Sequence, residues 1–542
     1  MTHWTCRAAA AAICLALAAC GQPSRDDGAV LHRGNAIEPG TLDPHRALIT
    51  NEQAIIYDLF LGLAQPGPDG RPIPGLADSW TVSEDGLEWV FHLRAASWSD
   101  GQPITADDVV GSLRRTLDAA TLNPFPALLF SIENASAVNA GEAPPEALGA
   151  QAIDPRTVRL TLAYPAPYLL DVLMQSTAVP VPLQVIAEHG EHWTRPENMV
   201  VSGPYRLASW RSFEHIRLVR NEAFHEADAA CIDTVYYYPT VDAAAAERRV
   251  RNGELDLNTD YLASNDAFLR REAPDLVRSV PGRVLRMLTL NTARPPFDDV
   301  RARRAVALAI DRDFIADQVL AGADRAAFQF MPDDVPGRTG PARMSQADEP
   351  MEPRRIAARA LLAEAGWGPD NPLRLTFSHQ PAASWPRLAP VIQADLTAIA
   401  PWVSVEIETA DTPIHYAQMQ AGDFDIASDG WAPYFDDAYG YLMVTESAAG
   451  EYNYSRWTDP EFDALLTRSH FELDERERGA LLAEAEQRLL DSAHYIPVFF
   501  ENQRALVGPR VEGWTAHARV INPTRWLCVG GEGAEAQPVP ER

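Results

Sequence analysis

Apolar and polar positions follow two spacings along the 542-residue chain, and each spacing predicts one kind of element. Alternation at every second residue, or a short apolar run, predicts strands. These fall at 88–94, 157–162, 216–219, 235–238, 254–257, 284–290, 373–377, 403–407, 424–427 and 496–500. Apolar residues three or four positions apart, bounded by capping residues, predict helices. These fall at 51–61, 105–119, 242–252, 300–320, 353–366, 391–400 and 474–490, and another begins at Pro460.

The order of these elements predicts the fold class. Helix 391–400 lies between strands 373–377 and 403–407, and this β-α-β order implies parallel strands in an α/β layer. Strand-rich blocks lie on either side of it, and a chain of this length is too long for one core. We therefore expect a multi-domain α/β protein with two or three domains.

The stretch 422–442 combines aromatic and acidic side chains. Its predicted strand is expected to break at Asp429-Gly430, a pair typical of turns. Trp431, Tyr434 and several other aromatic residues follow, beside Asp436 and Asp437. Such a mixture is costly to bury without partners, and it suits a pocket for a ligand with apolar groups and a positive end. The alternative is an aromatic corner of the core with two solvated acids.

Composition narrows the function classes. The chain has 75 acidic and 46 basic residues, a net charge of -29, with 46% hydrophobic and 22% charged residues. These fractions are those of an ordinary globular protein. The negative charge disfavours nucleic acid as a partner, because phosphates need a basic surface. It favours neutral or cationic ligands.

The N-terminus predicts export. Residues 1–19 read as a signal peptide, with Arg7 before an apolar run too short to span a bilayer. The run ends in LAAC, which resembles the lipobox of bacterial lipoproteins and implies cleavage before Cys20 and its lipidation. The alternative is an ordinary secretory signal with an accidental cysteine. Residues 20–30 read as a flexible tether, and residues 531–542 as a disordered tail.

Two cysteines remain after Cys6 and Cys14 leave with the signal and Cys20 is lipidated. Cys231 and Cys528 would then lie in a compartment where disulfides persist. We predict one disulfide between them. The alternative is a pair of buried free thiols.

The motifs of several enzyme classes are missing. The sequence has no Gly-x-Ser-x-Gly elbow and no GxxxxGK[ST] phosphate loop. Ala229 stands where a zinc helix beginning at His225 would need its second histidine, and His189 with His192 reads as a solvated pair. We therefore expect no catalytic residue, no bound metal and no cofactor.

Eight short motifs, in order along the chain, resemble the oligopeptide/dipeptide-binding family of ABC-importer solute-binding proteins (family 5). They are TLDPH at 41–45, PGLADSW at 74–80, DGLEWVFHLR at 85–94, DGQPITADDV at 100–109, SGPY at 202–205, PPFDDVR at 295–301 after Asn291, AIDR at 309–312, and GDFD at 422–425 with Gly430-Trp431. The resemblance implies an α/β, periplasmic-binding-protein type II-like clamp of two lobes and three domains. Domain I would comprise 31–65, 200–288 and 496–530, domain II 66–199, and domain III 289–495. Both Cys231 and Cys528 would then lie in domain I.

The resemblance also implies a function. A monomeric, lipid-anchored protein in the periplasm or on the cell surface would capture oligopeptides between its lobes and deliver them to the permease subunits of an ABC importer, without catalysis. Its lipid would be its only membrane contact. The alternatives are a nickel chelate, haem, an opine or a sugar on the same fold, or a different class, a secreted hydrolase.

Candidate ligand-binding residues follow from the same resemblance. In the family, an Asp three residues after the Trp pairs with the amine of the peptide, but this chain has Tyr434 there. Asp436, Asp437 or Asp260 would then replace it, or the ligand has no free amine. The remaining candidates are Trp431, the rim loop with Ile49 and Thr50, the wall residue Phe125, and the strand edge with Thr259 and Tyr261.

Overall fold

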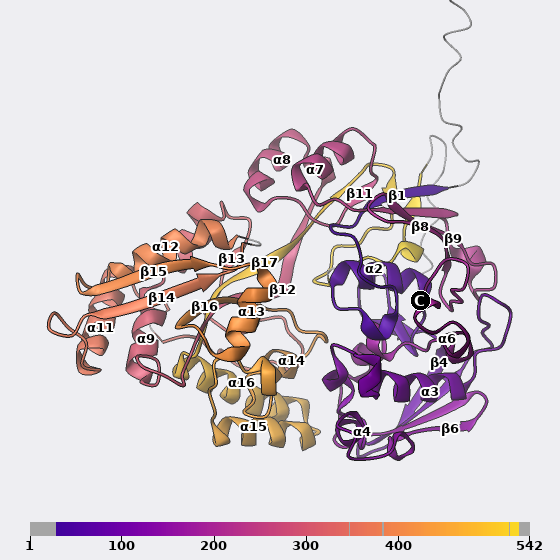
Figure 1. Cartoon of the computed structure of the whole chain (residues 1–542), viewed down its shortest axis with the longest axis horizontal. Helices are drawn as coiled ribbons and strands as arrows, with labels where there is room; N and C mark the ends of the chain where they lie inside the picture. Colours follow the sequence, from indigo (N-terminus) through magenta and orange to yellow (C-terminus); the bar gives the residue numbers. More distant parts are fainter. Residues whose placement is uncertain (1–28, 346, 382–383, 520, 531–542) are drawn as a thin grey trace, which may run out of the picture.

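The computed structural model describes residues 29–345, 347–381, 384–519 and 521–530 (Figure 1). The predicted signal peptide, Cys20, most of the tether and the C-terminal tail lie outside these residues. Within the described ranges, no helix combines the length and the apolar character needed to cross a bilayer.

One eleven-stranded sheet runs through the whole molecule. Its strands, in spatial order, are β15 (Val403–Thr409), β14 (Leu373–His379), β16 (Ile426–Trp431), β12 (Val277–Leu290), β17 (Tyr495–Val507), β11 (Leu257–Asn258), β1 (Val30–Gly34), β10 (Thr234–Tyr238), β9 (His215–Arg220) and β8 (Tyr205–Arg211), with β13 (Arg325–Ala326) paired to β17. The long strands β12 and β17 pair antiparallel and pass between two lobes (Figure 1).

Lobe 1 contains the β8–β11 end of this sheet and a separate four-stranded antiparallel sheet. The small sheet is formed by β4 (Ala77–Val82), β5 (Glu88–Leu93), β7 (Thr157–Thr161) and β6 (Ala150–Asp154). Helix α3 (Ala106–Leu117) packs on it and begins with the predicted capping box, in which Asp108 accepts the backbone N–H of Thr105 at 2.8 Å. The other elements of lobe 1 are α2 (Thr50–Leu59), β2 (Ala64–Pro66), β3 (Pro72–Pro74), α4 (Ala135–Asn139), α5 (Leu169–Leu173), α6 (Leu183–His189), α7 (Ala243–Arg251), α8 (Asp266–Glu272), β18 (Val511–Glu512) and β19 (Cys528–Val529).

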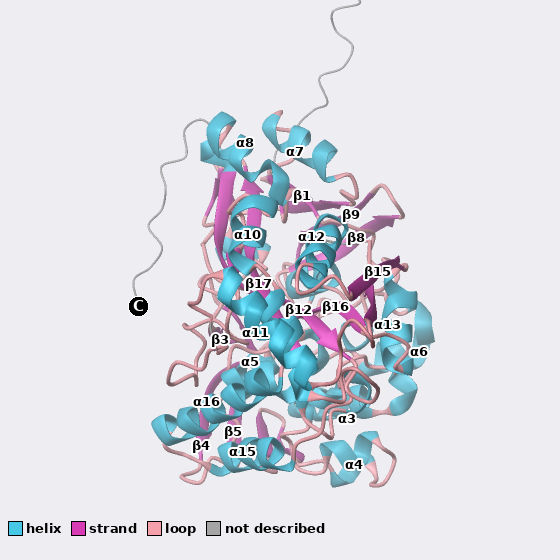
Figure 2. Ribbon diagram, turned by 90° about the vertical axis from the view of Figure 1, so that its left-hand side faces the viewer, coloured by secondary structure: helices cyan, strands magenta, loops and turns pink. Residues whose placement is uncertain are grey.

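Lobe 2 is an α/β layer followed by a helical region. Strands β14 and β15 are parallel in register, and α12 (Trp385–Thr397) connects them, which confirms the predicted β-α-β unit. The other helices are α9 (Val300–Ala309), α10 (Arg312–Phe314), α11 (Met351–Glu364), α13 (Thr412–Ala421), α14 (Ala438–Leu442), α15 (Pro460–Phe471) and α16 (Glu475–Ser492). Figure 2 shows α7 and α8 at one end of the molecule and α15 and α4 at the other.

The apolar core is not divided cleanly between the lobes. One cluster of buried side chains includes Phe91 and Leu169 from lobe 1 together with Phe435 and Leu465 from lobe 2. The lobes are therefore packed against each other in this structure. The domain boundaries given above remain a prediction, although three separate chain segments do meet at the lobe 1 end of the large sheet.

Several predicted element boundaries are wrong, and at two of them an aspartate side chain is involved. The strand expected to end at Asp429-Gly430 instead continues to Trp431, because Thr289 and the backbone N–H of Gly430 satisfy the buried Asp429 carboxylate. The helix expected over 300–320 ends at Ala309, and Asp311 caps a new short helix by accepting the N–H of Phe314. Local hydrogen bonding by aspartate therefore decided both boundaries.

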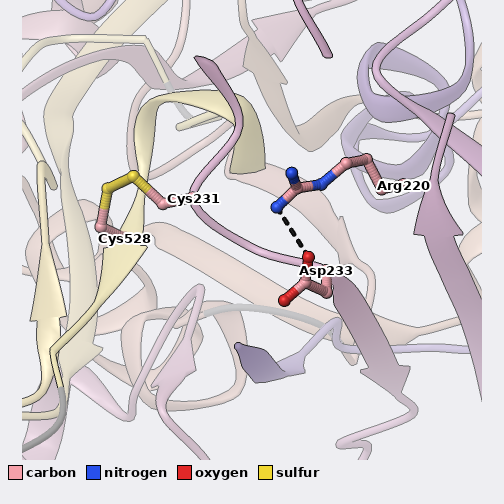
Figure 3. The surroundings of a disulfide bond; sticks show 4 residues. All are labelled: Arg220, Cys231, Asp233 and Cys528. Carbon is pink, nitrogen blue, oxygen red and sulfur yellow. Dashed lines mark ion pairs between the residues drawn. A yellow bond between two sulfur atoms is a disulfide. The ribbon is translucent and has the colours of Figure 1, made fainter. Parts of the chain in front are cut away.

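Cys231 and Cys528 form a disulfide, with their Cα atoms 5.1 Å apart (Figure 3). Nearby, Asp233 pairs with Arg220 at 2.7 Å and also accepts the backbone N–H of Ala29 at 2.8 Å. The bond closes a loop between residues 297 positions apart, so it joins the C-terminal segment to the start of β10.

We predict that replacing both cysteines by serine lowers the free energy of unfolding by about 2–5 kcal/mol, because the unfolded chain regains the entropy of a long loop. Urea denaturation of both proteins measures the loss. A reducing agent should lower the stability of the wild type and leave the double variant unchanged. Equal stability of the oxidised wild type and the variant would contradict this role.

Candidate ligand-binding site

An aromatic wall forms where β16 ends. The indole Nε1 of Trp431 donates to the carbonyl of Gly440 at 2.8 Å, which fixes the ring against α14. Tyr434 meets Trp431 edge-on, with ring centroids 5.9 Å apart, and Phe125 of lobe 1 lies 4.4 Å from Tyr434. The structure thus brings three predicted site residues, Phe125, Trp431 and Tyr434, together across the two lobes.

Further contacts across the lobes lie beside this wall. Gln175 of lobe 1 donates its side-chain amide to the carbonyl of Tyr434 at 2.7 Å. Tyr168 stacks on Phe435 with a centroid distance of 4.2 Å, and Tyr164 stacks on His470 at 4.1 Å. Sequence reasoning missed these lobe 1 residues, because the prolines around Tyr164 and Tyr168 indicated only the end of a strand. These contacts join the two lobes directly beside the wall.

The two acids that follow the wall are paired with arginines. Asp437 is buried, accepts two hydrogen bonds from Arg478 at 2.8 and 2.9 Å, and caps α14. Asp436 accepts from the Nε of Arg283 at 3.0 Å, and burial raises the pKa of its carboxyl. These ion pairs hold the loop in place and already supply each carboxylate with a positive partner.

The rim loop is held by an acid that sequence reasoning did not single out. The Glu52 carboxylate accepts backbone N–H groups from Leu48 at 2.7 Å and Ile49 at 3.1 Å, and from Gly40 at 2.8 Å. Ile49 is half-buried and Thr50, the first residue of α2, is exposed. Its position could have identified Glu52 from the sequence, because an acid at the third residue of a helix is typical of a capping box.

The three residues of the predicted strand edge, 259–261, differ in how far they are buried. Tyr261 is 2% exposed and its hydroxyl donates to Asp266 at 2.5 Å, so it belongs to a small core with Leu255 and Leu269. Thr259 is half-buried, and Asp260 is exposed beside Arg504 of β17. Packing, not ligand contact, therefore explains Tyr261.

A cavity of about 360 Å³ lies in lobe 2 between α9, α11 and the end of α16. None of the predicted ligand residues lines it. Its apolar lining includes Leu308, Leu361 and Leu490.

Comparison with known proteins decides the family. Residues 71–453 match bacterial extracellular solute-binding proteins, family 5, middle region. The chain belongs to this family. It is 33% identical over 495 residues to the periplasmic oligopeptide-binding protein OppA of Escherichia coli, with 90% of this chain and 89% of the relative covered. It is 32% identical over 493 residues to a probable deoxycholate-binding periplasmic protein of the same organism, with 90% and 91% covered.

Solved structures of this family share the fold. Haemophilus influenzae OppA in complex with the peptide RPPGFSPFR matches with a TM-score of 0.83 and 28% identity, over 93% of this chain and 99% of that chain. The unliganded open form of the murein tripeptide-binding protein MppA matches with a TM-score of 0.75 and 27% identity, over 94% and 99%. The two-lobed clamp predicted from the sequence is confirmed, and the structure has a higher TM-score with the peptide complex than with this open form.

We predict that Asp437→Asn lowers the free energy of unfolding by about 3–5 kcal/mol, because it leaves the buried Arg478 guanidinium without its anion. Urea denaturation gives the value. Asp69→Asn is the matched control, since its pair with Arg71 is exposed and should contribute less than about 1 kcal/mol. Equal, small losses in both variants would show that the buried pair does not hold this loop.

Proposed function

We propose that this protein captures peptides between its lobes and delivers them to the permease of an ABC importer. The observation that carries the proposal is the match, over nearly the whole chain, to oligopeptide-binding proteins in sequence and in structure. The match includes the strand and loop that hold Trp431 and Tyr434.

The large sheet offers a place for an extended peptide. Strand β16 pairs with β12 along its whole length, but its pairing with β14 stops at Ala427. Ser428 and Asp429 beyond that point are buried, but Gly430 and Trp431 are partly exposed and have a strand partner on one side only. A peptide backbone can add to such an edge, and the aromatic wall can receive its side chains.

We propose that Cys20 carries the lipid that tethers the protein to a membrane, in the periplasm or on the cell surface. The support is the LAAC sequence at the end of the apolar N-terminal run. Two acyl chains or more suffice for stable anchoring of a soluble body. We also propose that the protein is a monomer, since tethering through the lipid requires no contact with a second copy.

An amphipathic steroid acid is the second candidate ligand. The relative at 32% identity is described as a probable deoxycholate-binding protein. An apolar aromatic wall can take the flat face of a steroid as well as a peptide side chain. The ligand itself therefore has to be measured.

Trp431→Ala should weaken peptide binding about 30-fold or more, because an aromatic anchor at the centre of a site often contributes about 2 kcal/mol or more. Isothermal titration of ligand-stripped protein with a hydrophobic tripeptide gives the affinity. Phe213→Ala is the matched control, since Phe213 is 83% exposed and lies in the turn between β8 and β9. A tripeptide that fails to bind the wild type, while deoxycholate binds, would reject the peptide in favour of the steroid.

A further inference from the structure

A group of charged residues lies where the long strands β12 and β17 leave lobe 1. Arg286 contacts Glu501 at 2.6 Å, and Arg504 contacts Asp324 at 2.6 Å and Glu501 at 3.4 Å. Asp260, in the chain after β11, completes the group. We call these residues the hinge recess: Asp260, Arg286, Asp324, Glu501, Asn502 and Arg504.

Asp260 is the acid in this recess with the weakest pairing. Its nearest arginine nitrogen, Arg504 Nε, is 3.6 Å away, beyond hydrogen-bond distance, while 66% of its side chain is exposed. One carboxylate oxygen accepts the backbone N–H of Tyr261 at 2.7 Å. Asp260 therefore differs from Asp436 and Asp437, whose carboxylates are held by arginines at hydrogen-bond distance.

Two buried polar atoms of the hinge recess have no hydrogen-bond partner among the described residues. Arg504 is 6% exposed, yet its Nε has no hydrogen-bond acceptor among the described residues. The side-chain oxygen of Asn502 is likewise buried and without a donor within that part of the chain, although its amide nitrogen donates to the carbonyl of Ala323 at 2.8 Å. Such groups normally find partners, so a ligand that brings both a donor and an acceptor would complete this site.

The charges of the recess do not balance. Three carboxylates, Asp260, Asp324 and Glu501, face two guanidinium groups. Arg286 and Arg504 hold the pKa of Glu501 below its usual range even though burial alone would raise it. Burial, with the nearby Glu501 and Asp324, raises the pKa of Asp260 to about 6, against the opposing effect of Arg504. Since Asp324 and Glu501 are each in direct contact with an arginine, the unmatched negative charge is at Asp260.

We propose that Asp260 binds the free ammonium group of the ligand, while the Nε of Arg504 donates to a carbonyl oxygen beside that ammonium. The class of ligand is thus a peptide with an unblocked amino terminus, oriented with this end at the hinge recess. This rests on the proposed peptide-binding function. It places the amine anchor on lobe 1, away from the arginine-paired acids beside Trp431.

The alternative role for the same residues is to brace the hinge. If these residues only brace the hinge, replacing one of them should change the affinity for every ligand to the same extent. An amine site would distinguish a peptide with a free amino terminus from the same peptide with an acetylated one. Affinity for this matched pair therefore separates the two roles.

Isothermal titration of stripped full-length protein with Leu-Phe-Leu and N-acetyl-Leu-Phe-Leu tests the proposal. Asp260→Asn should weaken the free peptide about 10-fold or more, as expected for a lost charge-assisted hydrogen bond, and the acetylated peptide less than about 3-fold. Asp260→Glu should recover part of the loss. Asp348→Asn, a variant of an 88% exposed acid that pairs with Arg343, is the matched control and should change neither affinity.

The pH dependence gives a second readout. The ammonium binds the ionised carboxylate, so the wild-type affinity for the free peptide should be full above about pH 6 and fall as Asp260 is protonated below it. Asp324, Glu501, Arg286 and Arg504 face the same recess and remain in every variant. In the wild type, the affinity for the free peptide should depend more strongly on pH than the affinity for the acetylated peptide. Asp260→Asn should remove this difference.

Equal effects of Asp260→Asn on the two peptides, or no effect on either, would overturn the amine site while leaving peptide binding in place. Failure of both peptides to bind the wild type would overturn the proposed function, and this inference with it. Melting temperatures of the variants show whether each protein is folded. A folded Asp260→Asn protein that keeps the full wild-type preference for the free peptide would also reject the proposal.

Discussion

The antiparallel pairing of β12 with β17 is the constraint on which the rest of the structure depends. These strands belong to both lobes, and their register shifts between Val280 and Val284. Gly282 lies in this irregular stretch, where a Cβ atom would come within 2.1 Å of the carbonyl of Glu501. Only glycine permits that approach, so the strands can bend while their pairing continues on both sides. A bend at this point moves one lobe relative to the other.

Two kinds of contact hold the lobes in the arrangement described here. Stacked rings, such as Tyr168 on Phe435, contribute apolar burial where the lobes meet. Arg283 lies within the irregular stretch and pairs with Asp334 and Asp436, and its carbonyl accepts the hydroxyl of Tyr441. The aromatic loop is thus tied to the hinge strand itself. A change in the backbone of β12 at Arg283 would therefore displace the loop beside Trp431.

Sequence patterns predicted the elements better than the roles of single side chains. The β14-α12-β15 unit followed from periodicity, and Cys231 and Cys528 followed from counting thiols. The arginine partners of Asp436 and Asp437 did not, because Arg283 and Arg478 lie more than 40 positions away and only tertiary packing brings them close. Strand β17 also continues beyond residue 500 into charged positions, where the apolar pattern ends but backbone pairing does not.

Small-angle X-ray scattering of ligand-stripped protein, with and without saturating Leu-Phe-Leu, tests most directly whether the lobes close on a guest about β12 and β17. We expect a smaller radius of gyration when the peptide is bound, and a scattering profile of the complex that matches the structure described here. The same profile from the stripped protein and the saturated complex would contradict closure of the lobes on a guest.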